Sequence, residues 1–170
     1  FPPGAPSRGV YAVLPDSAGG LWLGTSGGLL YLDSTGRTRQ PPTLRTGTVH
    51  VLRRDRDDLW IGTSAGLVRY TPATGDWKTF RHDAADPASL SHDLVLALHI
   101  DSRGRLWVGT NGGLNHFEPA AERLVQHEEI AAFGSGAISS IVEDAEGRFW
   151  LGTNRGLVRY DPSATEGQRL

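Results

Sequence analysis

Short apolar runs bounded by turn-forming residues recur along the 170 residues of the chain, and no segment shows sustained helical periodicity. The most regular run reads Leu-Trp-Leu-Gly-Thr at residues 21–25, and similar runs follow at Leu59–Thr63, Leu106–Thr110 and Phe149–Thr153. In all four units, two variable positions follow the Thr, and a Gly and a Leu come after them. The tryptophans lie roughly 40 residues apart, a spacing typical of the blades of a β-propeller.

Each unit repeats the same order of predicted strands. The first strand ends in Asp: Val10–Asp16, Val49–Asp55, Leu94–Asp101 and Ile138–Asp144. An Asp-x-x-Gly turn precedes the Trp strand in three units, whereas the second unit reads Asp55-Arg56-Asp57-Asp58. A Gly-containing turn leads to the third strand: Leu29–Asp33, Leu67–Thr71, Leu114–Glu118 and Leu157–Asp161. The fourth strand is the least regular, at about 37–40, 77–81, 123–127 and a stub at 168–170.

The third strand sets the first unit apart. In the other units an aromatic residue lies four positions after the turn Gly, and Pro follows two positions later: Tyr70 and Pro72, Phe117 and Pro119, Tyr160 and Pro162. In the first unit Tyr31 comes one place early and no Pro follows. Pro ends a strand because it has no N–H to donate to the ladder.

We therefore predict an all-β fold, a β-propeller segment of four four-stranded antiparallel blades that belongs to a larger propeller. Residues 1–170 form one segment, with blades at approximately 9–40, 47–82, 93–127 and 136–170. Each Trp is expected to be a wedge between blades, and each following Gly to admit the adjacent sheet. We assign this structural role to Trp22, Trp60, Trp107, Trp150, Gly24, Gly62, Gly109 and Gly152. An open segment would expose two Trp-lined faces, which favours dimerisation.

Composition excludes several classes of function. The net charge of −2 shows no basic excess of the kind that binds nucleic acid, and no apolar run has the length of a membrane span. Cys is absent, which excludes disulfides and thiolate metal sites. Met is absent too, and the chain opens Phe1-Pro2-Pro3-Gly4, so we expect an excised segment of a longer protein.

The frame Asp-x-x-Gly-x-Leu-Trp-x-Gly-Thr-x-x-Gly-Leu-x-x-Tyr-x-Pro resembles the two-component regulator propeller repeat. Residues 101–119 match nearly throughout, as does the lead-in at 87–93, and the resemblance covers about residues 10–162. It implies the sensor region of a membrane histidine kinase or a related signalling protein, in the periplasm or outside the cell. Several family members sense oligosaccharides, and any kinase activity would belong to the parent protein. The family pattern defines blade structure and carries over no ligand residues.

Residues that occur in one unit only are the candidates for function. Propellers usually build a ligand face from the loops that link blades, here about 40–47, 82–93 and 127–136, and from the turns after the second strand. The ligand-binding candidates are Trp77, the one Trp outside the repeat position, the turn residues Asn111, Asn154 and Arg155, and the loop residues His82 and His92.

The loop at 82–93 also suggests two kinds of chemistry. Ser91-His92-Asp93 has the residue types of a catalytic triad, but adjacent side chains point in different directions. Its two His and three Asp are possible metal ligands, although Asp, Ser and Pro are ordinary turn formers. We predict no catalytic residue, no metal and no cofactor, and interpret His50, His99 and His116 as structural residues within strands.

Three functions remain open. The first is a non-catalytic sensing module that binds a small molecule or an oligosaccharide. The alternative is a protein-interaction or self-assembling scaffold that associates through exposed blade edges. A propeller lyase or glycosidase is the third, and it would need acid and base residues from different blades to meet near the axis. We expect neither a nucleic-acid partner nor membrane contact in this segment.

Overall fold

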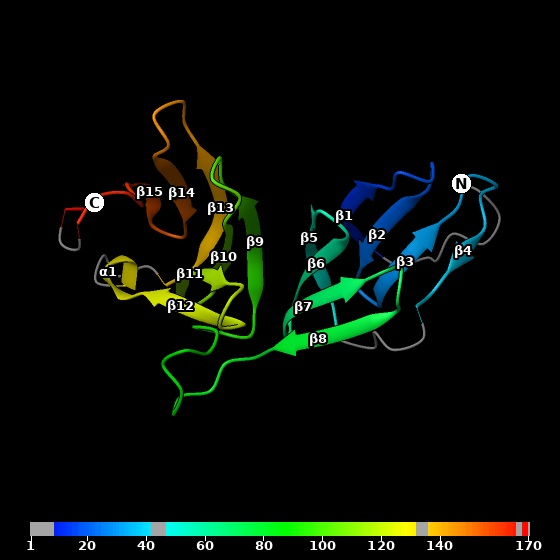
Figure 1. Cartoon of the computed structure of the whole chain (residues 1–170), viewed down its shortest axis with the longest axis horizontal. Helices are drawn as coiled ribbons and strands as arrows, with labels where there is room; N and C mark the ends of the chain where they lie inside the picture. Colours follow the sequence, from blue (N-terminus) through cyan, green and yellow to red (C-terminus); the bar gives the residue numbers. More distant parts are fainter. Residues whose placement is uncertain (1–8, 42–46, 132–135, 166–167, 170) are drawn as a thin grey trace.

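The computed structural model of the protein describes residues 9–41, 47–131, 136–165 and 168–169. Within them the chain forms four antiparallel sheets that follow one another along the long axis of the molecule (Figure 1). Successive strands are hydrogen-bonded neighbours, so each sheet is a meander. The sheets formed by the first and the last repeat lie at opposite ends of the molecule (Figure 1).

Each sheet contains the strands of one repeat. Sheet 1 contains β1 (Val10–Pro15), β2 (Leu21–Thr25), β3 (Gly28–Leu32) and β4 (Thr38–Arg39). Sheet 2 contains β5 (Val49–Asp55), β6 (Asp58–Thr63), β7 (Gly66–Thr71) and β8 (Asp76–Phe80). Sheet 3 contains β9 (Val95–Ile100), β10 (Leu106–Thr110), β11 (Gly113–Glu118) and β12 (Arg123–His127). Sheet 4 contains β13 (Ile138–Glu143), β14 (Phe149–Thr153) and β15 (Gly156–Tyr160), and a short helix, α1 (Glu128–Ala131), precedes it.

The predicted all-β architecture of antiparallel sheets is confirmed. Sheet 4 differs in its last element, because the described residues contain no fourth strand at the predicted stub 168–170. Instead, the N–H of Asp161 donates to the carbonyl oxygen of Arg169 at 2.6 Å. This bond holds Arg169 beside the end of β15, and Leu170 lies outside the described residues.

The recurring Thr of the repeat closes the hairpin between the second and third strands. In sheet 2, Thr63 Oγ1 donates to the carbonyl oxygen of Gly66 at 2.8 Å and accepts the N–H of Ala65 at 3.0 Å. Equivalent bonds recur at Thr25, Thr110 and Thr153. Gly66 has a φ of 118°, which favours glycine. The hydroxyl and the glycine together explain the Gly-Thr-x-x-Gly spacing.

The Asp of the Asp-x-x-Gly turn holds both the turn and the tryptophan. Oδ1 of Asp101 accepts two backbone N–H groups of its own turn, and Oδ2 accepts the indole N–H of Trp107 at 2.9 Å. In sheet 4, Asp144 binds its turn in the same way and accepts the indole N–H of Trp150 at 3.2 Å. One carboxylate therefore links the end of the first strand to the second.

The second unit, which lacks this turn Gly, closes the same hairpin differently. Asp55 pairs with Asp58 across a tight turn in which Arg56 has a φ of 53°. The indole nitrogen of Trp60 is buried and has no hydrogen-bond partner among the described residues. The departure seen in the sequence therefore removes a bond that sheets 3 and 4 both make.

Side chains alternate along the second strand, and this decides how the sheets meet. Trp60 and Gly62 lie on one face of sheet 2, and Leu59 and Ile61 lie on the other. We call the face with the Trp and Gly of the second strand the tryptophan face, and the opposite one the aliphatic face. At all three interfaces, the tryptophan face of one sheet packs against the aliphatic face of the next.

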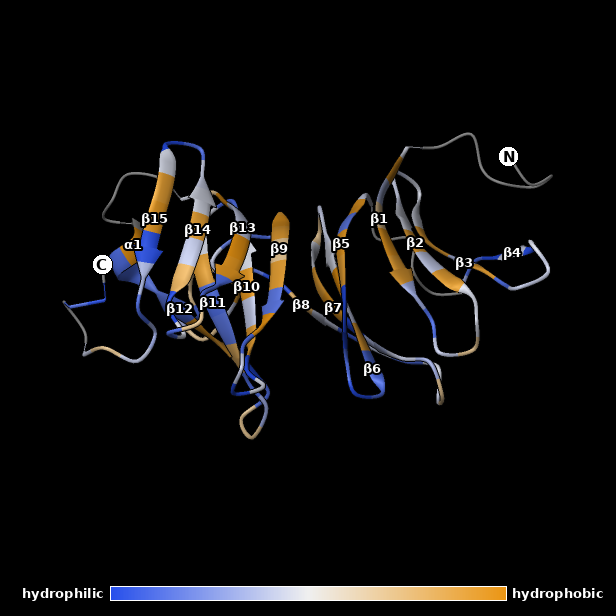
Figure 2. Ribbon diagram, turned by 90° about the horizontal axis from the view of Figure 1, so that it is seen from above, coloured by the Kyte–Doolittle hydropathy of each residue, from blue (hydrophilic) through white to orange (hydrophobic). Residues whose placement is uncertain are grey.

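The Gly that follows the tryptophan admits the first strand of the next sheet. A Cβ atom at Gly24 would lie 2.6 Å from Cγ1 of Val49, the first residue of β5. A Cβ at Gly109 would lie 2.7 Å from the carbonyl oxygen of Ile138, the first residue of β13. The first strands of neighbouring sheets accordingly pack together. Figure 2 shows that β1 and β9 are hydrophobic over much of their length.

One end of the molecule corrects an expectation. The prediction of two exposed Trp-lined faces is wrong, because the tryptophan face of sheet 1 is covered by sheet 2. Trp22, Trp60 and Trp107 are buried between sheets, as expected of wedges. Trp150 is 38% exposed, no described sheet covers its face, and its role as a wedge stays a prediction. The two uncovered faces are the aliphatic face of sheet 1 and the tryptophan face of sheet 4.

A matched pair of glycine substitutions tests this packing. Gly109→Ala should lower the free energy of unfolding by about 1–3 kcal/mol, because its methyl group would meet the backbone of β13. Gly152→Ala should cost clearly less, because the nearest atoms there are the side-chain hydroxyls of Ser139 and Ser140 in its own sheet. Urea unfolding of both variants measures the difference. Equal losses would contradict the assigned role of Gly109.

Candidate functional site

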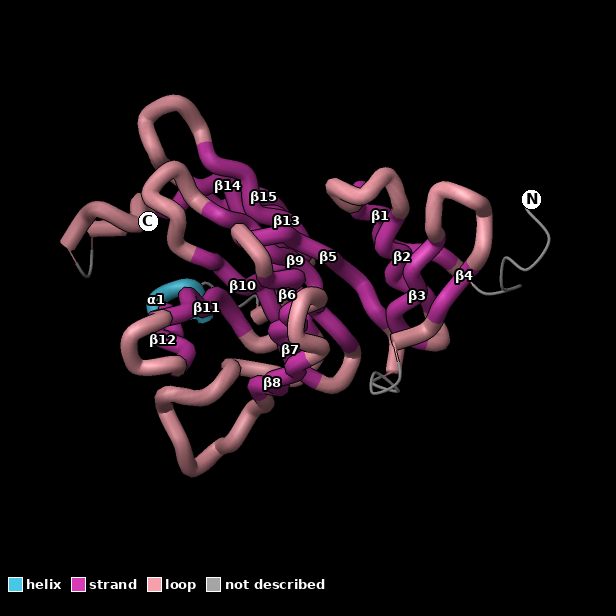
Figure 3. Tube along the Cα trace, turned by 45° about the vertical axis from the view of Figure 1, so that its right-hand side comes forward, coloured by secondary structure: helices cyan, strands magenta, loops and turns pink. Residues whose placement is uncertain are grey.

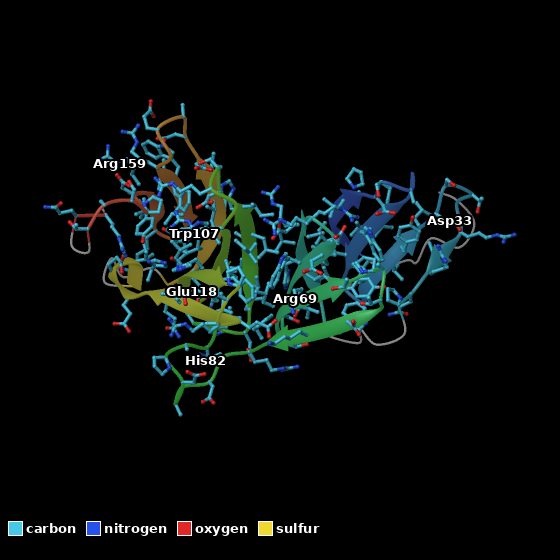
Figure 4. The ribbon with its side chains drawn as sticks, in the orientation of Figure 1. Asp33, Arg69, His82, Trp107, Glu118 and Arg159 are labelled. Carbon is cyan, nitrogen blue, oxygen red and sulfur yellow. The ribbon has the colours of Figure 1, made fainter. Side chains whose placement is uncertain are left out.

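His82 and His92 lie in the loop between β8 and β9, which projects beyond the sheets (Figures 3 and 4). Nδ1 of His82 lies 2.7 Å from the carbonyl oxygen of Leu90, and its backbone N–H donates to Asp93 at 2.8 Å. Nδ1 of His92 accepts the N–H of Leu94 at 2.9 Å. Both imidazoles therefore bind the backbone of their own loop.

The three candidate turn residues, Asn111, Asn154 and Arg155, are exposed. The N–H of Asn111 donates to the carbonyl oxygen of Leu94 at 2.9 Å, which places this turn beside the loop that carries His92. Asn154 and Arg155 project from the corresponding turn of sheet 4. In the described part of the chain, no hydrogen bond or ring contact joins them to any other candidate. The structure thus brings Asn111 near His92 and leaves the other two apart.

Trp77 lies in β8, the last strand of sheet 2, and is half-buried. Its ring stacks on that of Tyr70, with centroids 3.9 Å apart and planes 18° apart. Trp77 therefore packs against the core between sheets 1 and 2. As ligand-binding residues, all six candidates stay predictions.

The Ser91-His92-Asp93 sequence does not form a catalytic triad in the structure. Oγ of Ser91 lies 2.8 Å from Oγ1 of Thr110 and accepts a hydrogen bond from Nδ2 of Asn115 at 2.8 Å. Asp93 accepts the backbone N–H of His82 instead of an imidazole. Over the described residues, no group of three or more His, Cys, Asp or Glu side chains is arranged to hold a metal ion.

A pocket of about 390 Å³ opens between sheets 1 and 2, and we call it the aromatic pocket. Three aromatic rings and three polar side chains line it: Trp22, Tyr31, Tyr70, Asp16, Arg39 and Gln40. The ring centroid of Trp22 lies 4.7 Å from that of Tyr31 and 5.7 Å from that of Tyr70. Because β4 has only two residues, sheet 1 has little outer strand to cover these rings.

The position of Tyr31 makes this pocket specific to the first interface. Tyr31 pairs with Trp22 and so lies on the tryptophan face, whereas Tyr70 pairs with Leu59 on the aliphatic face of sheet 2. The two tyrosines therefore meet across the interface. Arg69 occupies the position of Tyr31 in sheet 2, and it pairs with Glu122 of sheet 3 at 2.8 Å. The tyrosine that came one place early in the sequence is the signal that predicts an unusual interface here.

Charged groups surround the Tyr31 ring. Oδ2 of Asp16 accepts the Tyr31 hydroxyl at 3.0 Å, and Oδ1 lies 2.6 Å from the Arg54 guanidinium. Burial alone would raise the pKa of Asp16, but these bonds and a backbone N–H outweigh it, so the pKa lies below its usual value. The Arg39 guanidinium lies 5.3 Å from the Tyr31 ring centroid and makes no salt bridge with a described residue.

The indole nitrogen of Trp22 also lacks a partner at normal hydrogen-bond geometry among the described residues. In sheets 3 and 4 the equivalent nitrogen donates to the Asp of the turn. In sheet 1 that carboxylate, Asp16, binds Tyr31 and Arg54. The aromatic pocket therefore combines ring surfaces, an ionised carboxylate and a guanidinium.

A second cluster, the histidine network, lies at the interface of sheets 3 and 4. Nδ1 of His116 lies 2.9 Å from Nε2 of His127, and Nδ1 of His127 lies 2.8 Å from the Tyr160 hydroxyl. Tyr160 also donates to Glu129 at 3.2 Å, and Arg169 donates to Glu129 at 2.9 Å. A pocket of about 500 Å³ borders the network. Because these five side chains bind one another, we interpret the network as structural.

Burial sets the charge states in the histidine network. Burial, together with the proximity of His116, lowers the pKa of His127 to about 4. Burial and the Glu129 carboxylate raise the pKa of the Tyr160 hydroxyl. At neutral pH, His127 is therefore an uncharged imidazole next to a neutral phenol. Sequence reasoning identified His116 as structural and did not connect it to His127 or Tyr160.

Three segments of the chain, residues 4–27, 89–112 and 132–155, match the sequence profile named Two component regulator propeller. These segments are therefore similar to two component regulator propeller repeats. The predicted resemblance is therefore confirmed. The second unit, which lacks the Asp-x-x-Gly turn, lies outside the matched regulator propeller segments. A search of curated proteins found no match.

Solved structures of extracellular domains are similar to this chain. The extracellular domain of BT4673 from B. thetaiotaomicron, described as a one component system in one structure, is 26% identical with a TM-score of 0.73, over 91% of this chain and 22% of that one. In a second structure BT4673 is described as a hybrid two component system, with 25% identity and a TM-score of 0.72, over 92% of this chain and 21% of that one. This chain therefore spans about a fifth of their length.

More distant structures show the fold alone. The extracellular domain of the hybrid two component system BT3049 from B. thetaiotaomicron is 19% identical, with a TM-score of 0.68 over 94% of this chain and 29% of that one. A streptogramin B lyase is 16% identical, with a TM-score of 0.62 over 92% of this chain and 55% of that one. The predicted β-propeller fold is confirmed, and the four sheets form an open part of one.

The buried His127 predicts a pH dependence of stability. Its pKa is lower in the folded chain, about 4, than the ordinary value of 6.5, so between these values the unfolded chain binds more protons. The free energy of unfolding should therefore fall as the pH decreases from about 6.5 to 4, by up to roughly 3 kcal/mol from this residue.

Urea unfolding over that pH range, for the wild type and for His127→Gln, measures the contribution. The variant should lose less stability on acidification, although His50 and His116, whose pKa values are also lowered by burial, keep part of the effect. The same pH slope in both proteins would contradict the assignment to His127.

Proposed function

We propose that this chain is a non-catalytic, ligand-sensing segment of an extracytoplasmic receptor, located in the periplasm or outside the cell. Three of its segments match two component regulator propeller repeats, and two similar solved structures, 26% and 25% identical, are extracellular domains. The described residues contain no helix of the length and hydrophobicity that a membrane span requires. Signal output and any catalysis would belong to other parts of the receptor.

The observation that carries the proposal is the aromatic pocket between sheets 1 and 2. Ring faces bind the C–H surfaces of a sugar, whereas a carboxylate and a guanidinium bind its hydroxyl groups. Tyr31 and Tyr70 offer rings, and Asp16 and Arg39 offer the polar groups. A site with a few polar groups among apolar walls fits a small ligand. We therefore propose a mono- or disaccharide unit as the ligand class.

Within this proposal, Trp77 supports the pocket from behind. Its ring stacks on Tyr70 and so fixes the position of a pocket wall. Asn111, Asn154, Arg155, His82 and His92 do not line the aromatic pocket. If they contact a ligand, it is at the loop surface and not at this site.

Binding of a panel of neutral and uronic-acid-containing disaccharides tests the proposal, with tryptophan fluorescence and the indole N–H resonance of Trp22 as readouts. Tyr31→Leu and Arg39→Ala should each weaken binding at least tenfold, about 1.4 kcal/mol, by removing a ring face or a donor. Arg37→Ala, an exposed residue of the same hairpin that does not line the pocket, is the matched control.

Two results would reject the aromatic pocket as the site. One is a panel in which no sugar perturbs Trp22. The other is a sugar affinity that is the same in Tyr31→Leu and Arg39→Ala as in the control Arg37→Ala.

A further inference from the structure

In sheets 3 and 4, an arginine stands just before the Trp strand and pairs with the Asp of the turn. Nε of Arg105 donates to Oδ2 of Asp101 at 2.7 Å, and Nε of Arg148 donates to Oδ2 of Asp144 at 2.9 Å. The Arg105 guanidinium also lies 5.1 Å from the ring centroid of Trp107. In these two sheets the carboxylate of the turn is therefore paired within its own hairpin.

Gly20 holds the position of this arginine in sheet 1, and it is buried. Its carbonyl oxygen accepts the N–H of Asp16 at 2.8 Å, as the carbonyl oxygen of Arg105 accepts the N–H of Asp101 at 3.0 Å, so the two turns have the same backbone bond. A Cβ atom on Gly20 would overlap the hydroxyl group of Tyr31. The phenol therefore occupies space next to Gly20 at the position where sheets 3 and 4 carry an arginine side chain.

Without a local arginine, the carboxylate of Asp16 is paired from the next sheet. The Arg54 guanidinium of β5 lies 2.6 Å from Oδ1 of Asp16, and among the described residues this is the one ion pair that joins sheets 1 and 2. Glu143 holds the register position of Arg54 in sheet 4, and it accepts the hydroxyl of Ser102, in the turn of sheet 3, at 2.6 Å. A first strand that reaches back to the preceding turn thus recurs, and at the first interface it holds the Asp of that turn.

The two oxygens of Asp16 connect this ion pair to a wall of the aromatic pocket. Oδ1 binds Arg54, and Oδ2 accepts the hydroxyl of Tyr31 at 3.0 Å. Tyr31 lines the pocket, whereas Arg54 does not. Because a hydrogen bond to an ionised carboxylate is stronger than one between neutral groups, this bond fixes the hydroxyl end of the ring. The ion pair between the sheets therefore helps to set the shape of the pocket.

We propose that Gly20 and Arg54 are positioning residues of the aromatic pocket, because together they set the ring of Tyr31. Gly20 leaves the space that the phenol fills. Arg54 holds the carboxylate to which the phenol donates its hydrogen bond. The inference rests on the proposed sugar site, and it adds to that site two residues that do not line it.

NMR of the ligand-free protein tests the positioning through the nuclear Overhauser contacts between the rings of Tyr31 and Trp22, whose centroids lie 4.7 Å apart. Arg54→Gln should weaken these contacts, because it removes the charge that holds Asp16. Arg54→Lys keeps the charge and should restore them. Arg53→Gln, an exposed neighbour on β5 that makes no ion pair with a described residue, is the matched control.

Gly20→Ala tests the space next to the phenol and should also displace the ring of Tyr31 from Trp22. Its methyl group would lie 2.7 Å from the carbonyl oxygen of Leu32, so circular dichroism checks that this variant folds. The Arg54 variants decide the inference where it does not fold. Ring contacts in Arg54→Gln that match those of the control Arg53→Gln would overturn the inference.

Titration of the same variants with the sugar that the wild type binds measures the consequence for the pocket. Arg54→Gln and Gly20→Ala should weaken binding roughly fivefold, a size usual for coupled neighbours, and Arg54→Lys should bind nearly as well as the wild type. Weaker binding with the ring of Tyr31 unmoved would overturn the inference as well. A wild type that binds no sugar would reject the proposed site, and the ring contacts, measured without ligand, still decide whether Gly20 and Arg54 position Tyr31.

Discussion

The contact between the tryptophan face of one sheet and the aliphatic face of the next is the constraint on which the rest of this structure depends. A buried Trp removes on the order of 200 Å² from water, and the adjacent Gly lets a neighbouring backbone approach. Trp60 and Trp107 show the contact complete, each against an aromatic ring of the following sheet. Thr and Asp of the repeat hold the hairpins that present these residues, so the whole motif serves one interface.

The candidate pocket lies where a unit departs from the motif. In sheet 1, Tyr31 lies on the face that carries arginine in sheet 2, and the outer strand has two residues. These departures leave rings and polar groups facing a common pocket. At the interface of sheets 3 and 4, the space is filled differently, because His116, His127 and Tyr160 bind one another there. The same scaffold thus yields an open pocket at one interface and a closed network at another.

Much of the fold could be predicted because the repeat is local. The second strand at Leu21–Thr25 and the first strand at Val49–Asp55 follow directly from alternation and turn residues. The expectation that both uncovered faces carry a Trp was wrong for sheet 1, because the strand pattern does not say on which side the neighbouring sheet packs. The role of Trp77 as a packing residue was missed as well, since its partner Tyr70 lies on another strand.

The sites were harder to predict than the fold. The loop histidines drew attention by residue type, yet His82 and His92 bind their own backbone. Tyr31 carried a signal, its shift by one place, but only the strand register shows that this shift turns the ring toward Tyr70. His127 and Tyr160 lie far apart in sequence, so no spacing rule joins them.

The indole N–H resonances of the five tryptophans, followed by hydrogen exchange in NMR spectra, test the stacking rule most directly. Trp60 and Trp107 should be protected from exchange, because the sheets that cover them belong to the same chain. Trp150 should exchange faster, because it is 38% exposed. A Trp150 signal as protected as that of Trp107, or a Trp107 signal that exchanges freely, would contradict the account.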